Sequence, residues 1–132
     1  MASVTDLRTA LATAMATIPN LRTSATVPDA PRPPVAVVMP DRIAYDVNAN
    51  RGADRFFFTI MLLVGRADDR AAQNKLDAFL VGANSIKAAV EADRTLGGTA
   101  NTCRVTEMSN YASMNVGETV YLAAQFTVEV VA

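Results

Sequence analysis

Residues 119–131 read TVYLAAQFTVEVV, and this stretch decides the fold because apolar and polar side chains alternate along most of it. Successive side chains of a β-strand point to opposite faces, so the alternation predicts a sheet with one face packed on a core. Residues 103–111 precede it and predict the other strand of a hairpin. The face expected to point inward consists of Val120, Leu122, Ala124, Phe126, Val128 and Val130.

Residues 55–65, RFFFTIMLLVG, form the most apolar segment of the chain and predict a second strand. A strand with one solvated face would not be apolar on both, so either helices cover both faces or another subunit covers one. The sequence supplies few helices for a second layer, which favours an oligomer. One face would carry Phe56, Phe58, Ile60, Leu62 and Val64, and the other Phe57, Thr59, Met61 and Leu63.

Helices and further strands are predicted on both sides of this segment. Ser3 and Asp6 have the spacing of a capping box and open an apolar stripe that ends near Ile18. Asp68 and Ser85 begin two more helical patterns, and the run from Pro28 to Pro34 is too rich in proline to be helical. Additional strands are expected at residues 21–27, 35–39 and 43–47.

These elements predict one α/β (α+β) domain that spans residues 1–132. We expect a mixed, mainly antiparallel sheet of about four to five strands. It would pack against an N-terminal helix and two central helices. No repeat, linker or low-complexity tail divides the chain.

The composition argues against most catalytic and metal chemistry. The chain has no histidine and a single cysteine, Cys103, which removes most zinc, haem and Ser-His or Cys-His sites. The adjacent Asp68 and Asp69 suit a helix N-terminus, and Gly97-Gly98 lacks the context of a phosphate-binding loop. We therefore predict no catalytic, metal-binding or cofactor-binding residue, and we do not expect an enzyme.

Charge and hydropathy limit the partners. The formal net charge is −1 and no basic run occurs. The sequence therefore lacks the positive charges that binding to the phosphate backbone of a nucleic acid requires. No secretion signal and no stretch of about 18 apolar residues is present, so neither export nor a membrane span is expected. We expect a soluble protein that folds in a reducing cytoplasm.

The polar loop at residues 48–54 separates two expected strands. Its seven residues are more than a tight hairpin needs, and long loops often make contacts. A solvated spacer is the plain alternative.

Four segments carry a resemblance to a known family. They are SIKAAVE (85–91), DRTLGG (93–98), CRVTEM (103–108) and VGETVYLAAQFTVEV (116–130). They resemble the tail terminator, or tail-completion, proteins of long-tailed (siphovirus-type) bacteriophages. The strand at 56–64, followed by Gly65-Arg66 and a helix, also fits, so the likeness covers most of the chain. These are patterns of strands, helices and turns.

The resemblance implies a structural role. Family members are α/β units that form a hexameric ring on the end of the tail tube, stop its polymerisation and present a surface to the head-side connector. The implied partners are further copies of the chain, the major tail tube protein and a head-tail connector or stopper protein. DNA would pass through the lumen without specific binding. The implied location is the neck of the virion, after assembly in the host cytoplasm.

On this hypothesis two groups of residues make the contacts. Phe57, Met61 and Leu63 would pack between subunits of the ring. Asn48, Asn50, Arg51, Asp54 and Arg55 would reach the tube or the adjacent subunit. Two alternatives remain open: a head-to-tail stopper or other neck protein, and a dimeric α+β protein that binds a small ligand between apolar strand faces.

Overall fold

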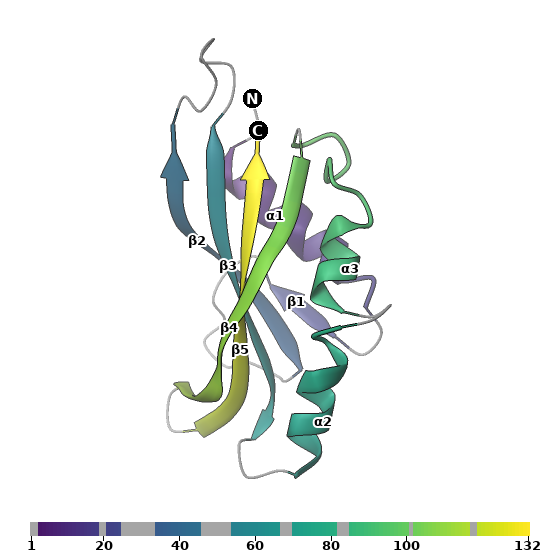
Figure 1. Cartoon of the computed structure of the whole chain (residues 1–132), viewed down its shortest axis with the longest axis vertical. Coiled ribbons are helices and arrows are strands. Elements are labelled where there is room, and N and C mark those ends of the chain that lie inside the picture. Colours follow the sequence, from purple (N-terminus) through teal and green to yellow (C-terminus); the bar gives the residue numbers. More distant parts are fainter. Residues whose placement is uncertain are drawn as a thin grey trace.

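The structure is a computed structural model that describes residues 3–18, 21–24, 34–45, 54–66, 70–81, 85–100, 102–116 and 119–132. The positions named for the expected tube contact, Asn48, Asn50 and Arg51, lie outside these ranges, as does Asp68. In chain order the elements are α1 (Val4–Met15), β1 (Arg22–Ser24), β2 (Val35–Ala44), β3 (Arg55–Arg66), α2 (Arg70–Ala78), α3 (Ile86–Glu91), β4 (Thr102–Val116) and β5 (Thr119–Val131), as drawn in Figure 1.

The strands form one five-stranded sheet in the order β1-β2-β3-β5-β4. β1 pairs with β2 in parallel, and the β2-β3, β3-β5 and β4-β5 pairs are antiparallel. The expected mixed, mainly antiparallel sheet with an N-terminal helix and two central helices is thus confirmed. β3 lies in the centre, where its apolar character on both faces is best accommodated.

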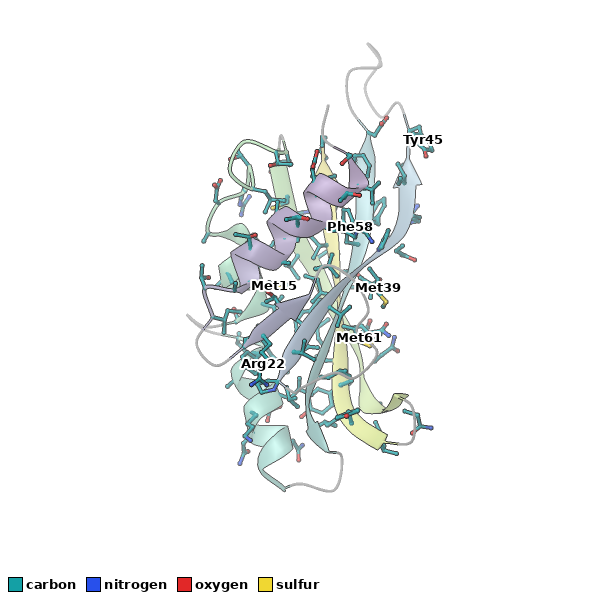
Figure 2. All side chains as sticks on the ribbon, turned by 180° about the vertical axis from the view of Figure 1, so that it is seen from behind. Met15, Arg22, Met39, Tyr45, Phe58 and Met61 are labelled. Atoms are coloured by element: carbon teal, nitrogen blue, oxygen red, sulfur yellow. The ribbon has the colours of Figure 1, made fainter. Side chains whose placement is uncertain are left out.

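The described helices lie on one face of the sheet. Figure 1 shows α1 behind the strands, and Figure 2, turned by 180°, shows it in front of them. α1 packs on β1 and β2, α2 on β3 and β5, and α3 on β4 and α1. The predicted inward face of β3 is confirmed, and so is that of β5 from Ala124 to Val130. Val120 was also expected to point inward, but it is 43% exposed, because β5 pairs with β3 only from Tyr121 onward. The buried core contains Leu7, Leu11 and Met15 of α1, Phe56, Phe58, Ile60, Leu62 and Val64 of β3, and Ala124, Phe126, Val128 and Val130 of β5, with Leu122 partly buried against it.

The helix starts follow from local hydrogen bonding. The amide of Asp6 donates to the Ser3 hydroxyl, and the amide of Ser3 donates to the Asp6 carboxylate, which is the predicted capping box. Ser85 caps α3 by accepting a hydrogen bond from the amide of Ala88. These caps set where α1 and α3 begin.

β2 differs from its prediction, because one strand runs from Val35 to Ala44 where two short strands were expected at 35–39 and 43–47. Tyr45 lies outside the strand, and residues 46–47 lie outside the described ranges. A break was expected at Pro40, which has no amide hydrogen for a ladder. The pairing with β3 shifts register between Pro40 and Arg42, and such bulges are where strands tolerate proline. β1 pairs only with Val35, Ala36 and Val37, so Pro40 also lies beyond the reach of that described neighbour.

Asp54 lies just before the first residue of β3, outside the strand as predicted, but its backbone is paired. Its amide donates to the carbonyl of Ala132 at 2.9 Å, and its carbonyl accepts from the amide of Ala132 at 3.0 Å. This backbone exchange extends the β3-β5 ladder by one residue pair. The sequence could not show it, because the partner lies at the far end of the chain.

Truncating Phe58 tests the helix-side core. Phe58 is 1% exposed and stacks on Phe56 with ring centroids 6.4 Å apart. We expect Phe58→Ala to lower the free energy of unfolding by about 3–5 kcal/mol in urea titrations, because a cavity replaces the ring. Tyr45→Ala, at a residue 71% exposed, is the matched control and should change it by no more than about 0.5 kcal/mol. Equal effects would contradict this core.

Candidate functional site

The sheet face opposite the helices is the candidate site, and we call it the distal face. A second apolar cluster lies on it, formed by the side chains of β2, β3 and β5 that point away from the helices. Phe57 occupies the same face of β3. Figure 2 labels Met15 in the helix-side core and Met39 and Met61 on the distal face. The apolar members of the distal face are Val35, Val37, Met39, Phe57, Met61, Leu63, Tyr121 and Ala123.

Burial varies across the distal face. Val35, Val37, Leu63 and Ala123 are at most 4% exposed. Met39, Phe57, Met61 and Tyr121 are half-buried. The half-buried group therefore retains apolar surface that a partner could cover.

This burial pattern reduces the number of residues that can form the predicted contact between subunits, which named Phe57, Met61 and Leu63. Leu63 is 2% exposed within a single chain, so its side chain is already covered and cannot supply the expected open surface. Phe57 and Met61 keep part of their surface exposed. The correction follows from the packing of Leu63 with Val35, Val37 and Ala123, which depends on strand order and could not be inferred from alternation along β3 alone.

A row of charged side chains borders the apolar part of the distal face. Arg55 Nε lies 2.9 Å from Glu129 Oε1, an ion pair without a directed hydrogen bond from this nitrogen. Arg104 Nη2 lies 3.8 Å from Glu129 Oε2. Glu129 thus stands between two guanidinium groups, and its side chain is 18% exposed. Arg55, predicted to reach a partner, is therefore also committed to a contact within its own sheet.

Arg42 adds a cation to the same region. Its guanidinium carbon lies 3.9 Å from the centre of the Phe57 ring, within the range of a cation–π interaction. Arg42 and Phe57 are direct cross-strand partners, so the register after the β2 bulge sets this contact. Sequence reasoning missed Arg42 and Glu129 as site residues, because each appeared only as the polar member of an alternating strand.

The middle of β4 is irregular, which turns neighbouring side chains in different directions. Asn110 has a φ of 55°, and its pairing register with β5 shifts between Ser109 and Ala112. The Asn110 side-chain amide donates to Gln125 at 2.8 Å, whereas the Tyr111 hydroxyl donates to Asp77 of α2 at 2.9 Å. Burial and the hydrogen bond to Asp77 raise the pKa of Tyr111. These contacts tie β4 to both β5 and α2.

Among the described residues, a groove of about 270 Å³ is lined by Leu80, Val81, Ser85, Lys87, Ala88 and Glu91. Two further grooves lie beside α1. One of about 500 Å³ is lined by Asp6, Thr9, Ala10, Gly98 and Thr99. A neighbouring groove of about 380 Å³ lies between α1 and α3 and is lined mainly by Ala and Thr side chains with Leu96. Asp93 at its edge already accepts hydrogen bonds from Thr95 and Gly97. The ligand-binding alternative expected apolar strand faces to line its pocket, and no strand residue lines these two grooves.

Two further observations concern the described residues only. None of their His, Cys, Asp and Glu side chains form a group of three or more that could hold a metal ion. Within the same ranges no helix has the length and apolar character needed to cross a membrane.

No family model and no curated protein sequence matches this chain. A proposal for its function therefore rests on the quoted sequence segments and on the geometry of the distal face.

Cys103 is held as a buried thiol. It is 1% exposed, and its sulfur lies 3.8 Å from the carbonyl oxygen of Val90. Burial, with a smaller contribution from the negative charges of Glu91 and Asp93, raises the pKa of Cys103 to about 11. The reactive thiolate is therefore scarce at neutral pH, which is typical of a cysteine that packs as a small buried side chain.

Thiol titration with a disulfide reagent tests this assignment. At about pH 8 the native thiol should react about a hundredfold more slowly than the thiol of the chain unfolded in urea, because the unfolded pKa is about 8.5. The native rate should keep rising about tenfold for each pH unit up to the raised pKa, whereas the rate of the unfolded chain levels off above about pH 8.5. Equal native and unfolded rates would show that Cys103 is accessible.

Proposed function

We propose that this chain is a tail terminator of a long-tailed bacteriophage, a virion protein that forms a ring on the tail tube. The ring stops polymerisation of the tube and offers a docking surface to the head-side connector. The resemblance of residues 85–91, 93–98, 103–108 and 116–130 to that family supports the proposal. The fold agrees with the α/β unit that the resemblance implies.

The observation that carries the proposal is the distal face. The helices are packed on the opposite face, so they leave Met39, Phe57, Met61 and Tyr121 half-buried beside the Glu129 ion pairs. A ring of identical subunits needs a patch that contacts a different patch on the next copy. The distal face supplies one of these patches, with Phe57 and Met61 as its apolar centre.

The energetics favour a contact that is weak for each pair of subunits. Covering the remaining surface of a half-buried Phe or Met side chain contributes about 1 kcal/mol. A few such residues stabilise one interface modestly, whereas a ring closed on a tube also gains the contacts of every subunit with the tube. This chain is therefore expected to associate weakly in solution and to form its ring on the tail tip.

The charged side chains beside Phe57 would orient the contact between subunits. Arg42, Arg55 and Arg104 lie around Phe57 and Glu129, and two of them are held by that single carboxylate. A neighbouring surface that contributes carboxylates would meet this border, whereas one that contributes further cations would be repelled. This arrangement selects one approach direction between copies.

Tail length in a phage that carries this gene tests the proposed function. Deletion of the gene should give filled heads beside overlong, unjoined tails in electron micrographs of the lysate, because nothing stops tube growth. Supplying the intact chain from a plasmid should restore tails of uniform length.

Two other outcomes have distinct meanings. Unjoined tails of normal length would contradict a terminator and indicate a head-to-tail stopper, since tube growth would end without this chain. Complete, infectious virions would exclude both virion roles and favour the small-ligand alternative.

A further inference from the structure

β4 is an edge strand of the sheet, and its outer edge has no described strand partner. Edge strands present backbone donors and acceptors that can pair with another chain, so soluble proteins usually protect them. Much of β4 carries one such protection, because its register shifts between Val105 and Glu107 and again between Ser109 and Ala112. Two stretches of β4 pair with β5 in regular register: residues 102–105, before the first shift, and residues 112–116, after the second.

Side chains of α3 bind the outward backbone groups of Val105, in the first of these stretches. The amide of Val105 donates to Glu91 Oε2 at 3.4 Å, and the carbonyl oxygen of Val105 accepts from Lys87 Nζ at 3.4 Å. Both groups of one residue therefore point away from β5 and towards α3. In an antiparallel ladder such a residue exchanges its amide and carbonyl with a residue of the next strand.

Lys87 and Glu91 are suited to replace that strand. They lie one helical turn apart on α3 and form an ion pair with each other. Arg94 Nη2 lies 3.0 Å from Glu91 Oε1, which holds the carboxylate in place. Burial alone would raise the pKa of Glu91, but hydrogen bonds from Lys87 and Val105 lower it below its ordinary value. The pair thus presents one acceptor and one donor to Val105.

We propose that the Lys87–Glu91 pair is an edge cap that prevents β4 from pairing with β4 of a second copy of this chain. A copy related by a two-fold axis through Val105 would run antiparallel to the first. Its own Val105 would offer a carbonyl where Glu91 now accepts and an amide where Lys87 now donates. The second copy is therefore the partner whose groups match both positions at once.

The edge cap and the distal face are separate surfaces with opposite effects. The distal face offers apolar surface to a neighbouring subunit, whereas the edge cap prevents the two-fold pairing of β4 with β4 of a second copy. The inference does not depend on the proposed function, because any monomer with this sheet order has the same exposed edge.

The double variant Lys87→Ala/Glu91→Ala tests the edge cap in the full chain. Sedimentation velocity over a concentration series should show self-association about tenfold or more tighter than in the unchanged chain, because two edge groups become free to pair. Hydrogen exchange of the Val105 amide should be faster than in the unchanged chain at low concentration and slow again as dimers form.

Lys75→Ala is the control, since it removes an exposed cation from α2 and leaves both contacts to Val105 in place. It should leave self-association unchanged.

If circular dichroism shows that the double variant is unfolded, Lys87→Met replaces it. Methionine is longer than alanine, so it keeps the packing of the Lys87 stem but lacks the donor. Faster exchange at Val105 without tighter association would overturn the role of the pair against a second copy. Unchanged exchange at Val105 would overturn the contact itself.

Discussion

The two-sided apolar character of β3 is the constraint on which the rest of the structure depends. One face of β3 is apolar along its whole length, and all described helices pack on that face. Its residues are Phe56, Phe58, Ile60, Leu62 and Val64. On the other side, Leu63 packs with Val35, Val37 and Ala123 of the neighbouring strands. Phe57 and Met61 remain half-buried. With its described helices on one face, the chain thus leaves part of its central strand exposed on the other.

Carboxylates held by two cations organise the polar parts of this sheet. Glu129 lies between Arg55 and Arg104, and Glu91 lies between Lys87 and Arg94. Exposed ion pairs stabilise a fold little, so their main effect here is positional. Glu129 orients arginines around Phe57 on the distal face, while Glu91 turns Lys87 towards the β4 edge. The same arrangement of charges therefore lies beside the apolar residues of the distal face and, in the case of Glu91, occupies backbone groups at the β4 edge.

Local patterns predicted the elements well, because alternation and capping depend on residues close in sequence. The faces of β3 and β5, the capping box of Ser3 and Asp6, and the start of α3 at Ser85 all follow from such patterns. Contacts between distant segments were not predictable in this way. The continuity of β2 through Pro40 needs a bulge opposite β3, and the burial of Leu63 needs β2 and β5 on either side. Arg42 on Phe57 likewise depends on register.

Thiol labelling of Met61→Cys tests most directly whether the distal face is the contact between subunits. Cys103 is buried with a raised pKa and adds little background, and Val81→Cys, at a residue 82% exposed, gives the rate of an open site. In the free chain Met61→Cys should react with a maleimide, more slowly than Val81→Cys. In virions assembled from the same variant, protection of position 61 is the result that the proposed ring requires. Equal labelling of position 61 in the free chain and in virions would contradict it.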